Sequence, residues 1–180
     1  MHTLGTPIVG VVEIGTRPNH DDRGSFREVF NSNHLPPDCA LPHGQLNQAI
    51  SRFGVIRGLH WQEPAQRKLC WVSRGRAFDV IVDLRRDSES FGRVVTRELN
   101  CFSCALVIPA GCAHGFQSLE NGTVFSYMVD PPYSGPPNQR GIRFDSLPDR
   151  IRWPVPPDPT LISAQDKYWP TFDQFVSGSL

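Results

Sequence analysis

Short runs of β-favouring residues recur along the chain and are separated by turn residues, and this pattern constrains the fold more than any other. The 17 prolines and 15 glycines are spread widely through 180 residues, so long helices are expected to be scarce. Several runs alternate apolar and polar residues, which is typical of strands with one buried face. The predicted strands cover residues 8–14, 25–30, 68–72, 76–84, 93–99, 105–109, 115–119 and 124–129.

Turn signals between these runs predict how the strands connect. Strands at this spacing favour a sandwich or a barrel over βαβ units. An Asn-Gly pair at positions 121–122 separates residues 116–119 from residues 124–129, and such a pair between two strands predicts a hairpin. We therefore expect these two strands to be neighbours in one antiparallel sheet.

The chain is expected to form a single domain over residues 1–180, because it has no internal repeat and no interdomain linker. Residues 31–35 are predicted to form a short helix. Residues 131–180 are Pro-rich and less periodic, so we expect them to wrap the β-core with turns and a short helix near Asp166.

The composition argues against two classes of partner. The formal net charge is +0 and the pI is about 7.0, whereas proteins that bind nucleic acid in bulk usually carry a basic surplus. No apolar run approaches the roughly 20 residues that a membrane-spanning helix needs. The N-terminus also lacks the charged-then-apolar order of a signal peptide, so a cytoplasmic protein is expected.

The five cysteines are an odd number, which is typical of free thiols in a protein that is not secreted. Cys101 and Cys104 have the spacing of metal ligands, but no second Cys or His pair follows at the distance of a zinc finger. We therefore interpret these two residues as small buried thiols on a strand and its turn.

Two cations and a potential base occur close together in the chain. Arg57 and His60 lie in the segment of residues 54–62, and Lys68 follows eight positions after His60. A strand alternates its faces, so Arg57 and His60 need a bend between them to reach one pocket. Gly58 can supply that bend, or let a ligand approach the backbone. Such a set suits an anionic substrate and proton transfer.

The histidines do not predict a metal site. His60 is followed by Gln62 where metal-binding double-stranded β-helices have a second histidine, and His114 alone adds one imidazole. Two imidazoles and an amide make a poor site for a divalent ion, so no metal is expected. Asp79 is placed to hydrogen-bond His114 and fix its tautomer, either as a structural pair or as part of the site.

The tyrosines leave alternatives open. Tyr127 shares one face of its strand with Phe125 and Val129, and either a core position or a proton donor in the barrel mouth fits this pattern. Tyr133 is better placed to stack on a base or a sugar. On spacing alone, Asp166 has the pattern of an ordinary surface charge, with Ser163 as a cap of a short turn, and Arg23 has that of a turn residue.

Taken together, these segments resemble the dTDP-4-dehydrorhamnose 3,5-epimerase family, which contains metal-free cupin-type enzymes of sugar-nucleotide synthesis. The resemblance runs from about Asp21 to Trp169 and rests on the order and number of its segments. They are residues 22–28, 45–47, 55–62, 68–69, 78–85, 88–92 and 108–116, Tyr127, Tyr133, and residues 153–154 and 163–166. The resemblance implies a mainly β fold, a jelly-roll barrel of the cupin type, and activity without a cofactor.

The resemblance also implies a role for individual residues. His60 would be the general base that removes a proton beside the C4 ketone, and Asp166 would orient it and raise its basicity. Lys68 would stabilise the enolate oxygen, and Tyr127 would return a proton from the opposite face. The implied contacts to the diphosphate, sugar and nucleoside of the substrate come from Arg23, Phe26, Glu28, Gln45, Asn47, Arg57, His114 and Tyr133.

Family members are typically homodimers in which an N-terminal segment reaches the partner's site. Phe26 and Glu28 are therefore expected to act across an interface. The chain departs from the family where a glutamate often follows five residues after Tyr133, because this position is Asn138. This difference is compatible with another nucleotide, another 4-keto sugar, or epimerisation at only C3 or only C5.

Three alternative functions are compatible with the sequence. A sugar-nucleotide 3,4-ketoisomerase also moves protons beside a carbonyl but relocates the ketone. A metal-dependent cupin, either a dioxygenase or a lyase, would use His60, Gln62 and His114 as ligands. A non-catalytic sugar-binding cupin would bind a sugar nucleotide without exchanging its protons with solvent.

Overall fold

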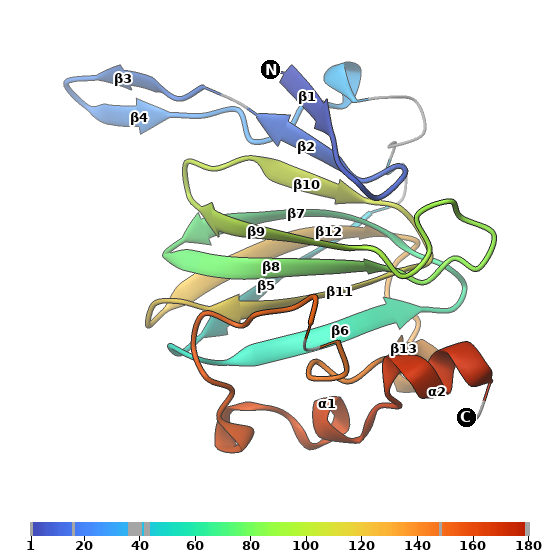
Figure 1. Cartoon of the computed structure of the whole chain (residues 1–180). Helices are drawn as coiled ribbons and strands as arrows, with labels where there is room; N and C mark the ends of the chain where they lie inside the picture. The colour runs from blue at the N-terminus through green and yellow to red at the C-terminus, as the bar shows by residue number, and fades with distance from the viewer. Residues whose placement is uncertain (1, 16, 36–40, 42–43, 148, 179–180) are drawn as a thin grey trace.

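Two antiparallel sheets face each other and enclose the centre of the molecule (Figure 1). The computed structural model describes residues 2–15, 17–35, 41, 44–147 and 149–178. The larger sheet has the order β1 (His2–Gly5), β2 (Val12–Gly15), β10 (Ala105–Ile108), β7 (Arg67–Arg74), β12 (Thr123–Asp130) and β5 (Gln45–Ser51). The second sheet has the order β13 (Gln139–Gly141), β6 (Ile56–Gln62), β11 (Cys112–Ser118), β8 (Arg76–Asp83) and β9 (Val94–Asn100).

This arrangement is the jelly-roll barrel of the cupin type, so the predicted fold class is confirmed. A separate hairpin, β3 (Asn19–Asp21) and β4 (Gly24–Phe26), projects from one end of the barrel (Figure 1). Helical structure is limited to short pieces: η1 (Ser32–His34), η3 (Pro136–Asn138), η4 (Pro159–Leu161), α1 (Ala164–Tyr168) and α2 (Phe172–Ser177). None of the helices in the described ranges is long and apolar enough to cross a membrane.

Strand β8 is buried on both faces, which explains its almost continuous apolar sequence. Ala77 and Ile81 point into the core between the sheets, whereas Val80 and Val82 point outward. The outward face is covered by the C-terminal segment, including Phe172. The prediction that the last third of the chain wraps the β-core, with a short helix near Asp166, is therefore confirmed.

The predicted hairpin at Asn121-Gly122 is wrong. Strand β11 pairs with β6 and β8, whereas β12 pairs with β5 and β7 in the other sheet. The Asn121-Gly122 turn does reverse the chain, but it connects a strand of one sheet to a strand of the other. Each of the two strands therefore lies between two neighbours of its own sheet.

Strand β5 was not predicted, and its burial pattern gives the reason. Its polar residues Gln45 and Asn47 point into the barrel and line a cavity, while Leu46 and Ile50 point outward and are 60% and 70% exposed. The usual order of apolar inside and polar outside is thus inverted. The short strands β1, β3 and β13 were also missed, and residues 31–35 contain only the single turn η1.

The cysteines are free thiols where the structure describes them, as predicted. Cys70 and Cys112 are buried. Cys101 and Cys104 are only half-buried, so the prediction of two buried thiols is wrong for this pair. Cys104 lies at the rim of the core, where its thiol is 3.8 Å from a carboxylate oxygen of Glu13. The prediction for Cys39 lies outside the described residues.

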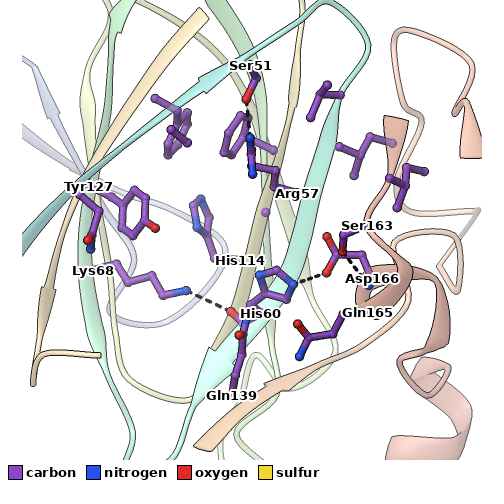
Figure 2. A pocket seen from close by; sticks show the side chains of 18 of the residues that line it. Ser51, Arg57, His60, Lys68, His114, Tyr127, Gln139, Ser163, Gln165 and Asp166 are labelled. Carbon is purple, nitrogen blue, oxygen red and sulfur yellow. Dashed lines mark hydrogen bonds and ion pairs between the residues drawn. The ribbon is translucent and has the colours of Figure 1, made fainter. Parts of the chain in front are cut away.

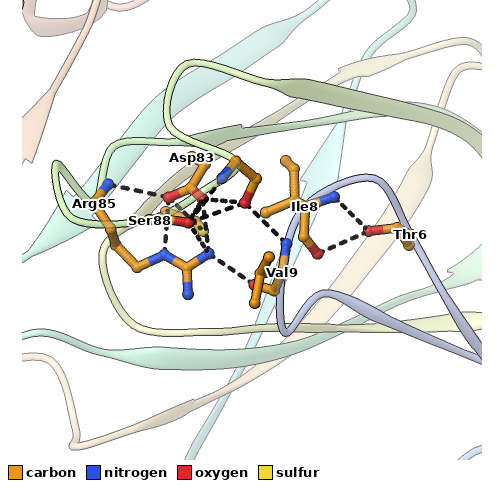
Figure 3. Close-up of polar contacts among 8 residues, drawn as sticks. Thr6, Ile8, Val9, Asp83, Arg85 and Ser88 are labelled. Atoms are coloured by element: carbon orange, nitrogen blue, oxygen red, sulfur yellow. Dashed lines mark hydrogen bonds and ion pairs between the residues drawn. The ribbon is translucent and has the colours of Figure 1, made fainter.

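A buried carboxylate ties the N-terminal segment to the end of β8 (Figure 3). Asp83 accepts hydrogen bonds from the Arg85 guanidinium at 2.8 Å and from the hydroxyls of Ser88 and Ser90 at 2.7 and 2.6 Å. The same Arg85 and Ser90 also bind the backbone of Val9, at 2.7 and 2.9 Å. This network fixes the segment that precedes β2 against the barrel.

Candidate active site

A cavity of about 670 Å³ lies between the two sheets. Its walls come from β5, β6, β7, β11 and β12, and the C-terminal segment around α1 closes one side (Figure 2). The cavity brings together most of the residues that the sequence singled out. They are Gln45, Asn47, Arg57, His60, Lys68, His114, Tyr127, Tyr133 and Asp166.

His60 and Asp166 form a hydrogen-bonded pair at the cavity wall. Their Nε2 and Oδ1 atoms are 2.5 Å apart, although 106 positions separate the residues in the chain. Ser163 caps α1 by accepting a hydrogen bond from the Asp166 N–H at 3.1 Å, and so fixes the turn that carries the carboxylate. Gly58 N–H donates to the other carboxylate oxygen at 3.4 Å.

The Asp166 carboxyl is held as a carboxylate by these partners. Burial raises its pKa, but the hydrogen bond and charge of His60, with the Gly58 and Ser163 contacts, leave the pKa below its ordinary value. A carboxylate at Nε2 keeps the proton of the neutral imidazole on that nitrogen. Nδ1 is then the nitrogen of His60 that can accept a proton.

Two glycines let β6 and β11 approach closely beside this pair. A Cβ on Gly58 would lie 2.6 Å from Gly115 Cα, and one on Gly115 would lie 2.5 Å from the Arg57 carbonyl oxygen. Gly58 also has a φ of +126°, which side chains with a Cβ rarely adopt. Here the ladder shifts register, and both Arg57 and His60 line the cavity. The predicted bend is confirmed, and the backbone that Gly58 approaches is that of β11.

Lys68 is a buried cation next to the His60 backbone. Its side chain is on β7, and its Nζ donates to the His60 carbonyl oxygen at 3.1 Å (Figure 2). Burial lowers the pKa of Lys68 below its ordinary value, while the nearby charge of Asp79 opposes this effect. The ammonium group is therefore held at a fixed place in the wall.

His114 and Asp79 form a second pair, as the sequence predicted. His114 Nε2 is 2.7 Å from Asp79 Oδ2, and both side chains are buried. Asp79 Oδ1 is buried and has no hydrogen-bond partner among the described residues. The pair holds the His114 ring in one orientation in the cavity wall.

Tyr127 faces His60 from the other sheet. Its ring enters the cavity from the side opposite His60 (Figure 2), and it shares this inward face with Phe125 and Val129. Burial raises the pKa of the Tyr127 phenol above its ordinary value. The hydroxyl is therefore protonated at neutral pH and able to donate a proton.

Two glutamines fix the loop that carries Tyr133. The Tyr133 N–H donates to Gln45 Oε1 at 2.9 Å, and the next N–H, of Ser134, donates to Gln62 Oε1 at 3.2 Å. Gln62 is thus used to hold a loop. Asn138 turns back onto Ser134 Oγ at 2.9 Å and does not line the cavity.

No group of three or more His, Cys, Asp or Glu side chains in the described part of the chain is arranged to hold a metal ion. The amide oxygen of Gln62, which the metal-dependent alternative would use as a ligand, accepts a hydrogen bond from the Ser134 N–H at 3.2 Å. The cavity instead contains three cations, Lys68, Arg52 and Arg57. Arg57 donates to Ser51 Oγ at 3.1 Å, and neither arginine forms an ion pair with a described residue.

Three of the predicted binding residues do not reach the cavity of their own chain. Arg23 is exposed and forms an ion pair with Asp21 at 2.5 Å, and Phe26 is 73% exposed. Both belong to the β3–β4 hairpin, which points away from the barrel (Figure 1). Glu28 follows this hairpin and accepts a hydrogen bond from Asn31 at 3.1 Å.

Sequence reasoning did not assign several lining residues to the site, namely Ser51, Arg52, Gln139 and Gln165, and it gave Ser163 only a capping role. Arg52 had a usable signal, because it lies next to the turn that leads to Arg57. Gln165 lies within residues 163–166, which carry part of the family resemblance. Gln139 had no signal, since an isolated glutamine in a Pro-rich segment is typical of the surface.

The fold and the cavity together define a cupin-type barrel equipped for acid–base chemistry on an anionic ligand. The family model for dTDP-4-dehydrorhamnose 3,5-epimerase matches residues 5–174. The chain belongs to this family, as the sequence resemblance indicated.

Relatives and solved structures agree with this assignment. A dTDP-4-dehydrorhamnose 3,5-epimerase of Sinorhizobium fredii is 41% identical over 159 residues, which cover 86% of this chain and 81% of the relative. The structure of the Mycobacterium tuberculosis rmlC epimerase has a TM-score of 0.89 at 29% identity, covering 100% of this chain and 93% of that one. ChmJ, a 3'-monoepimerase of Streptomyces bikiniensis solved with dTDP-quinovose, has a TM-score of 0.88 at 29% identity, with 100% and 91% coverage.

Proposed function

We propose that this protein epimerises a nucleotide-linked 4-keto-6-deoxy sugar at C3, at C5 or at both, without a cofactor. One observation carries the proposal: the His60–Asp166 pair and the Tyr127 hydroxyl face each other across one cavity, with Lys68 in its wall. Inversion of a carbon beside a ketone needs a base on one face, an acid on the other, and a cation for the enolate.

The reaction follows from this geometry. His60 Nδ1 takes the proton from the carbon beside the C4 ketone, and the electron pair of the broken C–H bond moves to the ketone oxygen. Lys68 stabilises the enolate oxygen, and Asp166 stabilises the imidazolium that forms. The electron pair then returns to the carbon, which takes a proton from the Tyr127 hydroxyl on the opposite face.

The charge of the cavity favours a nucleoside diphosphate as the anionic portion of the ligand. Arg52 and Arg57 add two cations to Lys68, whereas Asp166 is the carboxylate that lines the cavity in the described ranges. We assign Arg57, Gln45 and Asn47 to the diphosphate and sugar, His114 to the sugar, and Tyr133 to the nucleoside. A dTDP-linked substrate is proposed because the relatives act on dTDP sugars by name.

A homodimer is part of the proposal. The β3–β4 hairpin presents Arg23 and Phe26 away from its own cavity, and Phe26 is 73% exposed. Insertion of this hairpin beside a partner's cavity would bring both residues, with Glu28, to the nucleotide. We also propose one domain, because the C-terminal segment supplies Asp166 to the barrel. The free thiols favour a cytoplasmic location.

Proton NMR in D2O tests the function directly. Purified protein is mixed with dTDP-4-keto-6-deoxyglucose, and the H3 and H5 signals are followed separately. We expect exchange at one or both positions, and loss of exchange in His60→Ala. Exchange at both defines a 3,5-epimerase, exchange at one a single-centre enzyme, and a relocated ketone the ketoisomerase. Absence of exchange at both positions contradicts the proposal.

A further inference from the structure

The indole of Trp169 lies against the imidazole of His60. The two ring centroids are 6.2 Å apart and the planes meet at 69°, which is a favourable edge-to-face arrangement. Trp169 does not line the cavity, so it approaches His60 from behind. It is therefore a neighbour of the proposed base without being a candidate for contact with substrate.

The backbone of β13 is shaped to accept this indole. Gly141 pairs with His60 in the ladder between β13 and β6. A Cβ on Gly141 would lie 2.5 Å from Trp169 Nε1 and 2.6 Å from its Cδ1 and Cε2. No other residue fits this position while the ring stays in place. The indole thus packs directly on the strand residue that faces His60.

One short segment contacts His60 at two points. Asp166 is in the first turn of α1, and Trp169 is the C-cap of the same helix. The segment is anchored just beyond, where Arg143 N–H donates to the Pro170 carbonyl oxygen at 2.9 Å. Asp166 fixes one nitrogen of the imidazole, and a ring contact at a second point is what restricts rotation about that hydrogen bond.

The unpartnered indole nitrogen points to a packing role. Trp169 Nε1 is buried and has no hydrogen-bond partner among the described residues. Buried tryptophans usually find an acceptor, as Trp153 does by donating to the Phe144 carbonyl oxygen at 3.1 Å. A hydrogen bond to the described protein therefore does not account for the position of Trp169, whereas contact with Gly141 and His60 does.

We propose that Trp169 is a positioning residue for His60: with Gly141 behind it, the indole holds the imidazole plane so that Nδ1 faces the substrate while Nε2 stays on Asp166. The inference rests on the proposed function for its kinetic consequence only. Small displacements of a catalytic group reduce turnover more than binding. Loss of the ring should therefore act on kcat and leave KM unchanged.

Three variants test the role by kinetics. We expect Trp169→Leu to lower kcat for H3 or H5 exchange by roughly tenfold to a hundredfold, with KM and the Kd of dTDP within about twofold of wild type. Trp169→Phe keeps an aromatic face and should recover most of kcat. Trp153→Leu removes a comparable indole from the same C-terminal segment without touching His60, and should leave kcat near that of wild type.

A second readout needs no turnover. In the free protein, the Nε2–H protons of His60 and His114 are hydrogen-bonded to carboxylates, and each is visible by NMR when its exchange with water is slow. Trp169→Leu should broaden the His60 signal by faster exchange and leave the His114 signal sharp. A mere loss of ring current would shift the signal without broadening it.

These outcomes separate the two proposals. Wild-type protein without exchange contradicts the proposed function, and the NMR readout then judges Trp169 by itself. A sharp His60 signal in Trp169→Leu, or kcat within twofold of an active wild type, overturns the positioning role. Equal losses of kcat in Trp169→Leu and Trp153→Leu also overturn it, because the effect would then be a general one on the C-terminal segment.

Discussion

The histidines of two His–Asp pairs line the same cavity, but the two pairs are built differently. His60 is bound by Asp166 from a helix outside the barrel, across 106 positions of the chain, and its side chain is 24% exposed. His114 is bound by Asp79 from the adjacent strand, across 35 positions, and its side chain is 8% exposed. The first imidazole is accessible and able to exchange protons, whereas the second is locked inside a sheet.

The difference shows how the same kind of residue pair serves two purposes. The buried His114–Asp79 pair forms a rigid part of the cavity wall, and one oxygen of Asp79 has no partner among the described residues. The accessible His60–Asp166 pair can receive a proton, and small changes in the C-terminal segment can alter its geometry. We therefore assign proton transfer to His60 and orientation of the sugar to His114.

The largest expected effect on activity comes from substituting the two histidines and tests whether their roles differ. His60→Ala should lower exchange at H3 and H5 by roughly 10²- to 10⁴-fold, because it removes the general base. His114→Asn keeps a polar side chain in the wall and should cost about tenfold or less, seen as a raised KM. Equal losses in the two variants, measured by NMR in D2O, would refute the division of roles.

The next effect concerns the accessible pair. Asp166→Asn should lower kcat by roughly 10- to 10³-fold, because the imidazolium loses its carboxylate and the tautomer is no longer fixed. The fold should persist, because the amide has the same shape as the carboxylate and its partner, the His60 ring, is only partly buried. Steady-state kinetics with dTDP binding as control would measure it. Unchanged kcat would show that Asp166 does not act on His60.

The buried pair should respond in stability more than in rate. Asp79→Asn leaves buried groups in the β8–β11 ladder imperfectly paired, and we expect a loss of about 1–3 kcal/mol in the free energy of unfolding. Urea unfolding of Asp79→Asn and Asp166→Asn side by side provides the comparison. A larger loss of stability in Asp166→Asn than in Asp79→Asn would reverse our assignment.

The smallest expected effect concerns a buried carboxylate that belongs to neither pair. Burial raises the pKa of Asp83, but hydrogen bonds from Arg85, Ser90 and Ser88 lower it to about 2 from an ordinary value of 3.8. Its stabilisation is therefore present above pH 4 and is lost as the pH falls toward 2.

Asp83→Asn removes this contribution at neutral pH and should flatten the acid limb of the stability curve, while exchange activity at pH 7 stays near that of wild type. Thermal unfolding between pH 2 and pH 7 measures both curves. An Asp83→Asn curve parallel to that of wild type would contradict the assignment.

The sequence predicts the fold well where burial follows the usual rule. Strands such as β8 and β12 alternate or are continuously apolar, and their bounds agree with the prediction to within a few residues. The prediction fails for β5, because its inward face is the polar wall of a cavity. It also fails at Asn121-Gly122, since turn residues determine a reversal of the chain but not the sheet that receives the next strand.

The contacts in the site also differ in how far the sequence predicts them. His114 and Asp79 lie on neighbouring strands, so their contact follows from strand order. His60 and Asp166 meet through the path of the C-terminal segment, which no local pattern encodes, and family resemblance alone predicted their pairing. The contact of Trp169 with Gly141 and His60 has no signal in spacing or composition. Arg23, Phe26 and Glu28 stay predictions, because one chain does not bring them to its cavity.

The most direct test of the account compares Tyr127→Phe with His60→Ala in D2O, following both deuterium incorporation and configuration at C3 and C5. If His60 and Tyr127 act on opposite faces, Tyr127→Phe should still incorporate deuterium through His60 but with retention of configuration, whereas His60→Ala should incorporate it at least roughly 10²-fold more slowly than wild type. Inversion by Tyr127→Phe at the wild-type rate, or incorporation by His60→Ala at the wild-type rate, would contradict the two-face mechanism.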